Sequence, residues 1–150
     1  MSSIRRSSPV AVASLLALLA CSSVEPPTAP DAVPTGPGGG IPTGTGVTGR
    51  FVQTGYAVAG TATLAIENGV ARLDFSSDFA IANTPGPVVY LNTTNNPNTG
   101  RALRVGALKS RSGAQQYSFQ VPAGVRYAWI IIWCDPFNVA MAEASIPPTP

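Results

Sequence analysis

The stretch TATLAIENGVARLDF, residues 61–75, decides the fold class of this chain. Each half alternates apolar residues with small or polar ones, which is the period of a strand with one buried face. Asn68-Gly69 separates the halves, and this dipeptide favours a type I′ turn because both central residues of that turn need a positive φ. The stretch therefore predicts an antiparallel β-hairpin.

The chain after Gly49 repeats this pattern of short alternating segments and turns. Segments of strand length alternate with turns rich in Gly, Asn and Pro, and the sequence contains no long amphipathic helical pattern. About eight short strands with frequent turns predict an all-β fold, an antiparallel β-sandwich. The strands expected after the hairpin are Val88–Leu91, Leu103–Val105, Gln116–Val121, Tyr127–Cys134 and Phe137–Ile146.

The segment WIIIWC, residues 129–134, is apolar on both faces of its predicted strand. Side chains alternate along a strand, so Trp129 and Trp133 share one face while Ile132 and Cys134 share the other. A strand in a two-layer sandwich normally buries one face and exposes the other to water. Two alternatives follow: loops cover the tryptophan face, or that face is an interaction surface.

The amino-terminal 48 residues predict an export signal and a tether. Arg5 and Arg6 precede the apolar segment Val10–Leu19, which is shorter than the roughly 20 residues of a membrane span. The sequence then reads LLAC, which resembles a bacterial lipobox, where the cysteine is lipidated and becomes the first residue. The alternative is an ordinary signal peptide cut near Ala20.

These features divide the chain into three parts. We expect a lipoprotein signal peptide at 1–20, a lipidated Cys21 with a disordered Pro/Gly/Thr tether over 21–48, and a folded domain over 49–147. Two or more acyl chains hold a protein stably on a membrane. The expected location is therefore the bacterial cell envelope, at the outer membrane or on a periplasmic or extracellular face.

Charge and histidine content exclude several functions. The sequence has nine Lys and Arg residues and seven Asp and Glu residues, and two of the nine basic residues precede Cys21. The chain after Cys21 is therefore close to neutral, and we expect no nucleic-acid partner. The sequence has no histidine, which excludes a Ser-His-Asp triad, a His-ligated zinc and a blue-copper site. We predict no metal site, and no group of residues predicts a catalytic centre.

Cys134 is the only cysteine left once Cys21 carries lipid. It has no disulfide partner within the chain and no C-x-x-C motif, which excludes dithiol exchange of the thioredoxin kind. Two interpretations stay open from the residue alone: a buried hydrophobic filler, or a working thiol. Asp135 follows the sulfur directly and is expected to oppose thiolate formation by like charge.

A set of short motifs follows in order along the chain. The most specific are Leu108-Lys109 with Gly113, Gln116 and Tyr117, and the pattern Trp133-Cys134-x-x-Phe137. The other motifs are Gly49-Arg50-Phe51, Leu73-Asp74-Phe75 with Phe79, Pro87-Val88-Val89-Tyr90-Leu91, Val105-Gly106-Ala107, Asn138-Val139 and Ala144. Together they resemble the DM13 family over residues 49–146, with a departure at Met141-Ala142, where an aromatic residue and a glycine are usual in that family.

The resemblance implies a β-sandwich that works as an electron-transfer module. It implies that Cys134 acts as a bare redox thiol or as a ligand to a haem-like group, and that the chain meets a redox partner protein. Met141 is a candidate second haem ligand, with core filler as its alternative. The function predicted is therefore a membrane-anchored electron carrier rather than an enzyme.

A non-enzymatic surface-binding or adhesion module is the alternative function. Its contact surface would be the face of Trp129 and Trp133, or a set of basic residues. These are Arg101, Arg104, Lys109 and Arg111, which are also typical of a solvated sheet edge.

Overall fold

The structure is a computed structural model, and it describes residues 40–149. The predicted signal peptide, Cys21 and most of the predicted tether lie outside these residues. The described chain forms ten strands and one 3-10 helix. They are β1 (Val47–Gln53), β2 (Val58–Ala59), β3 (Thr61–Glu67), β4 (Val70–Phe75), β5 (Ala80–Ile81), β6 (Pro87–Asn92), β7 (Leu103–Ala107), β8 (Gln115–Gln120), β9 (Trp129–Cys134), η1 (Asp135–Phe137) and β10 (Val139–Ser145).

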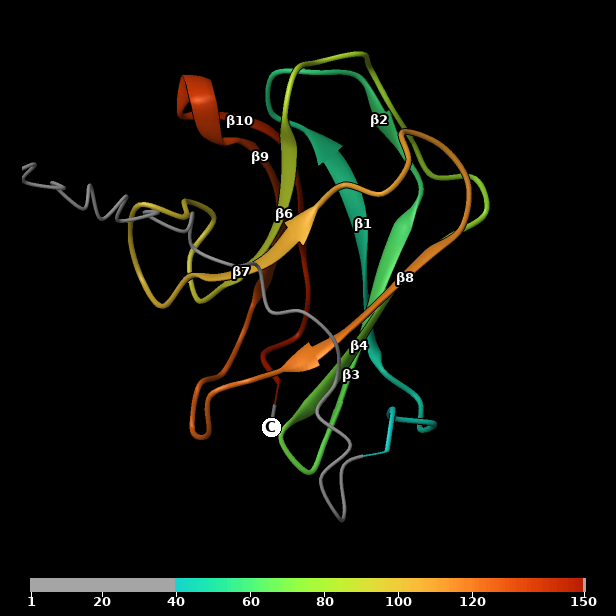
Figure 1. Cartoon of the computed structure of the whole chain (residues 1–150), viewed down its shortest axis with the longest axis vertical. Helices are drawn as coiled ribbons and strands as arrows, with labels where there is room; N and C mark the ends of the chain where they lie inside the picture. The colour runs from blue at the N-terminus through green and yellow to red at the C-terminus, as the bar shows by residue number, and fades with distance from the viewer. Residues whose placement is uncertain (1–39, 150) are drawn as a thin grey trace, which may run out of the picture.

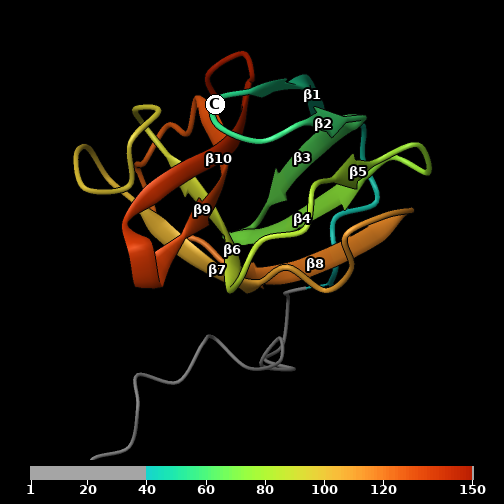
Figure 2. The same cartoon turned by 90° about the horizontal axis from the view of Figure 1, so that it is seen from above.

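Eight of the strands form one antiparallel sheet folded into two layers. The strand order is β7-β6-β9-β10-β1-β3-β4-β8, and β2 pairs separately with β5. The first half of β1 pairs with β3, and its second half pairs with β10. Strand β1 thus belongs to both layers, which face each other across the core in Figures 1 and 2. The predicted all-β antiparallel sandwich is confirmed.

The hairpin predicted from residues 61–75 is the β3–β4 pair. Thr63 pairs with Asp74, and the pairing continues to Glu67 opposite Val70. Asn68 and Gly69 have φ values of 51° and 78°, as a type I′ turn requires. Local sequence therefore determines this turn.

The core fills the space between the two layers. An aromatic group lies at its centre, in which the Phe75 ring is 5.0 Å from Phe51, 4.8 Å from Phe79 and 5.8 Å from Tyr117. These tilted and edge-on contacts suit the ring quadrupoles. The Tyr117 hydroxyl also accepts a hydrogen bond from the Lys109 amide at 3.1 Å, so it links β8 to the chain just after β7, the other edge strand.

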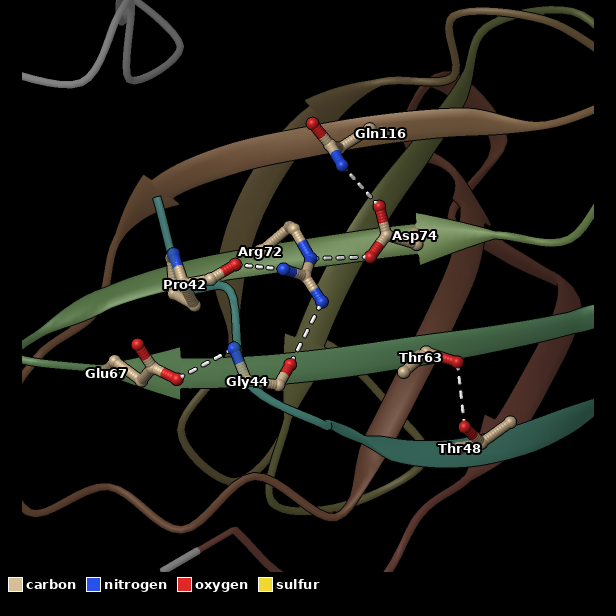
Figure 3. A network of polar contacts seen from close by, with 8 residues as sticks. All are labelled: Pro42, Gly44, Thr48, Thr63, Glu67, Arg72, Asp74 and Gln116. Atoms are coloured by element: carbon tan, nitrogen blue, oxygen red, sulfur yellow. Dashed lines mark hydrogen bonds and ion pairs between the residues drawn. The ribbon is translucent and has the colours of Figure 1, made fainter. Parts of the chain in front are cut away.

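The segment before β1 lies against the outer face of the layer that contains β3 and β4. The Arg72 guanidinium donates to the carbonyl oxygens of Pro42 and Gly44, and it pairs with Asp74 at 2.8 Å. The Glu67 carboxylate accepts from the Gly44 amide at 3.0 Å. Figure 3 shows this network from close by. Ordered structure thus begins before residue 49, within the range predicted as tether.

No helix within residues 40–149 has the length and apolar character to cross a membrane.

Candidate functional site

Cys134 lies at the last position of β9, with its side chain in the core. It is a free cysteine and is 2% exposed. Its Sγ donates a hydrogen bond to the Pro85 carbonyl oxygen at 3.1 Å. The thiol is therefore enclosed, and its one polar contact is to the segment between β5 and β6.

Met141 is the extra residue of a β-bulge. Ala140 pairs with Trp133 and Ala142 pairs with Ile132, so Met141 has no partner on β9. Its side chain is fully buried, and the Thr84 hydroxyl donates to its Sδ at 3.4 Å. Thr84 and Pro85 are adjacent, so the two sulfur side chains, Cys134 and Met141, lie beneath one short stretch of chain.

This stretch, Thr84–Gly86, covers both sulfurs, and we call it the cover. Thr84 is buried, whereas Pro85 and Gly86 are exposed, so the cover is a single layer of chain. Gly86 has a φ of +59°, and a Cβ there would lie 3.4 Å from the ring of Pro136. The Arg111 guanidinium donates to the carbonyl oxygens of Ala82 and Thr84. Arg111 thus holds the Thr84 end of the cover.

Asp135, the residue after Cys134, has hydrogen-bond and ion-pair partners of its own. The Asp135 carboxylate accepts from the Tyr90 hydroxyl at 2.8 Å and pairs with Arg104 at 3.2 Å. Desolvation and then the hydrogen bond to Asp135 raise the pKa of Tyr90. The Asp135 carboxylate is therefore engaged by Tyr90 and Arg104.

The tryptophan face of β9 is largely covered. Trp133 is 7% exposed, Ile131 between the two tryptophans is fully buried, and Trp129 is half-buried. Of the two alternatives drawn from the sequence, the geometry favours coverage. The large apolar residues that are exposed lie elsewhere, with Phe137 at 64% and Val52 at 50%.

The four basic residues have separate surroundings. Arg104 pairs with Asp135, and Arg111 binds the carbonyls of residues 82 and 84. The Lys109 ammonium donates to the Gln116 carbonyl oxygen and lies 4.8 Å from the centre of the Tyr117 ring. Arg101 is exposed on the loop that ends at β7. Each residue therefore has its own environment, and only Arg111 touches the cover.

The comparisons with known proteins identify the family. The sequence model described as "Electron transfer DM13" matches residues 50–146. The chain belongs to the DM13 family. The searches of curated proteins and of solved structures gave no match. The matched span runs from β1 to the residue after β10, so the DM13 domain comprises the whole sandwich.

A haem ligand needs a sulfur that faces an open cavity. Cys134 is 2% exposed and Met141 is fully buried, and the pocket outside the cover is lined by Asn83, Thr84, Pro85 and Arg111 rather than by either sulfur. The packed arrangement does not fit a haem.

Sequence reasoning found the two sulfur residues but missed the cover. The signal within Asn83-Thr84-Pro85-Gly86-Pro87 is that of a turn, because Pro and Gly favour turns in any fold. The contact between Cys134 and Pro85 joins residues 49 positions apart. No local pattern shows that this turn lies above Cys134.

Proposed function

We propose that this protein is a lipid-anchored electron-transfer module of the bacterial envelope, with the Cys134 thiol as its redox group. The observation that carries the proposal is the position of Cys134. It is the one free thiol among the described residues of a DM13 electron-transfer domain, and a single layer of chain separates it from the surface. Once the cover opens, one-electron oxidation of the thiol by an oxidised partner leaves a sulfur-centred radical, transfers the electron to that partner and releases the S–H proton to water.

The anchor is the second part of the proposal. A lipidated Cys21 would hold the chain at the membrane, 19 positions before residue 40, the first residue that the structure describes. In Figure 1 residues 40–46 lie at the lower end of the long axis, whereas η1, next to Cys134, lies at the upper end. A tether at the lower end would leave the Cys134 end accessible to other proteins.

Voltammetry of the full-length chain in detergent tests the redox role. We expect a redox wave in the native chain, none in Cys134→Ser, and a retained wave in the control Met141→Leu. A wave that persists in Cys134→Ser, or its absence from the native chain, contradicts the proposal. A Soret band in the visible spectrum would contradict the bare-thiol version.

Mass spectrometry and fractionation test the anchor separately. We expect acyl chains on Cys21 in the native protein, and release of Cys21→Ser from the membrane fraction. An unmodified Cys21 in a protein that still sediments with membranes would contradict lipid anchoring. A membrane-held but redox-silent domain would instead favour the binding or adhesion alternative.

A further inference from the structure

We propose that the cover over the two sulfurs is also the docking site for the redox partner, which inserts a carboxylate side chain beside Arg111. This inference rests on the proposed electron-transfer role. A partner must approach the thiol closely to exchange electrons with it. The cover contacts the Cys134 thiol through Pro85, which is itself exposed, so a partner that touches the cover comes close to the sulfur.

A shallow pocket lies on the outer side of the cover. It has a volume of about 300 Å³ and is lined by Asn83, Thr84, Pro85 and Arg111. From below, the same Thr84 and Pro85 contact Met141 and Cys134. One layer of chain therefore has a binding pocket on one side and both sulfurs on the other.

The charge of this pocket favours an anion. A guanidinium has five N–H donors, and the Arg111 hydrogen bonds are those to the carbonyls of Ala82 and Thr84. Within residues 40–149, Arg111 has no carboxylate within ion-pair distance. The neighbouring Asn83 is exposed, and its side chain makes no hydrogen bond to the described residues. Free donors on a fixed guanidinium suit a carboxylate, which they can bind with two hydrogen bonds.

An exposed aromatic residue lies in the chain next to the Gly86 end of the cover. A Cβ placed on Gly86 would lie 3.4 Å from the ring of Pro136, and the next residue, Phe137, is 64% exposed. Interfaces commonly combine an apolar or aromatic contact with polar contacts around it. A shallow pocket buries little of a free small acid, whereas a protein can cover Phe137 and fill the pocket together. These features favour an acidic protein surface as the occupant.

The test uses glutarate as a mimic of a glutamate side chain. In NMR titrations of the full-length chain in detergent, we expect saturable shifts at Asn83, Thr84 and Arg111, with a Kd on the order of 1–10 mM. Neutral glutaramide should cause none. Arg111→Gln should weaken binding about tenfold or more, since hydrogen bonds to charged groups contribute about 1.5–3 kcal/mol. Arg111→Lys should restore part of the binding.

Two further variants test whether glutarate binds in this pocket or to positive charge elsewhere on the surface. Asn83→Asp should abolish glutarate binding, because the new carboxylate repels the anion and can itself pair with Arg111, while the exposed position of residue 83 leaves the fold unchanged. Arg126→Gln changes an exposed arginine in the loop between β8 and β9, and it should bind as the native chain does.

A second probe tests the contribution of Phe137. The peptide N-acetyl-Leu-Glu-Leu-amide should bind about threefold to tenfold tighter than glutarate, as burial of apolar surface adds to the ion pair. Phe137→Ser should remove this gain and leave glutarate binding unchanged.

Several results would overturn the proposal. They are the absence of shifts at the pocket, equal binding by Asn83→Asp, or a peptide gain that survives Phe137→Ser. Micromolar glutarate binding would assign the pocket to a free small acid instead of a partner. These measurements need no redox chemistry, so a failure of the Cys134 role and a failure of the docking site are distinguishable.

Discussion

The enclosed position of Cys134 makes its chemistry depend on the residues above it. A buried thiol reacts with a soluble reagent only from an opened state, so its rate measures the free energy of local opening. The cover ends at Gly86, which has a φ of +59°. That conformation is strained for any residue with a Cβ. Gly86 is therefore the residue at which opening can be changed with the least effect on the core.

Gly86→Ala should speed the reaction of Cys134 with an aromatic disulfide reagent. The left-handed conformation costs alanine about 1–2 kcal/mol, and a penalty of 1.4 kcal/mol carried by the closed state raises the open population about tenfold. Stopped-flow absorbance measures the rate. Gly124→Ala is the matched control, because Gly124 has a φ of +73° and nothing within 4 Å of the added Cβ. Equal acceleration by both variants would show that global unfolding, and not the cover, limits the reaction.

Strand β9 supports the fold on both of its faces. Ile130 and Ile132 belong to the main core, while Ile131 is fully buried on the opposite face with Trp133. Strand β9 lies between β6 and β10 in the sheet, and its outward-facing residues are buried as well as its core-facing ones. The tryptophans should therefore differ in their contribution to stability according to burial.

Trp133→Ser should destabilise the fold by about 3–5 kcal/mol, the usual cost of truncating a buried large aromatic side chain. Trp129→Ser should cost clearly less, because Trp129 is half-buried. Urea unfolding followed by circular dichroism gives both free energies. If Trp133→Ser folds as stably as the native chain, the tryptophan face is an open surface after all, and the adhesion alternative regains support.

The segment before β1 depends on one arginine for its attachment. Arg72 bridges Pro42 and Gly44 to Asp74. Arg72→Met should lower the free energy of unfolding by about 1–2 kcal/mol and make residues 40–46 sensitive to proteases. Arg50→Met, at an exposed position of β1, is the control and should change neither. Unchanged protease resistance in Arg72→Met would mean that Glu67 alone holds the segment.

The elements differ in how far the sequence predicts them. The β3–β4 turn follows from Asn68-Gly69, because its cause is local. Strand β1 contains Gly49 and lacks a clear alternation, so pattern alone did not predict it. The reason for Gly49 is tertiary, because a Cβ there would clash with the Ser145 carbonyl oxygen. The cover over Cys134 is hidden for the same reason, since only the packed sandwich brings residues 84–86 to β9.

The whole molecule separates its two proposed tasks along one axis. Residues 40–46 and their Arg72 contacts lie at one end, and the 3-10 helix beside Cys134 lies at the other (Figure 1). The eight-stranded sheet connects these ends through backbone hydrogen bonds, so the substitution of one side chain leaves this connection in place. Attachment and electron exchange would then be independent: variants at Arg72 should leave the Cys134 end unchanged, and variants at Gly86 or Arg111 should leave the tether attachment unchanged.

Stability at high pH is a property of the molecule as a whole. Burial raises the pKa of Tyr90, Tyr117 and Tyr127 above the ordinary value of 10.0. Below pH 10 these tyrosines are neutral in both the folded and the unfolded chain, so their contribution is fully present. Above pH 10 the unfolded chain loses their protons first. The folded chain then binds more protons than the unfolded chain, and the free energy of unfolding must fall as pH rises.

Urea unfolding between pH 9 and pH 11.5 should therefore show stability that declines above about pH 10. Tyr117→Phe should flatten the decline, because one of the buried hydroxyls with a raised pKa no longer ionises on unfolding, although the variant loses the hydrogen bond from Lys109. A decline that is equally steep in Tyr117→Phe would assign the alkaline sensitivity to groups other than the core tyrosine.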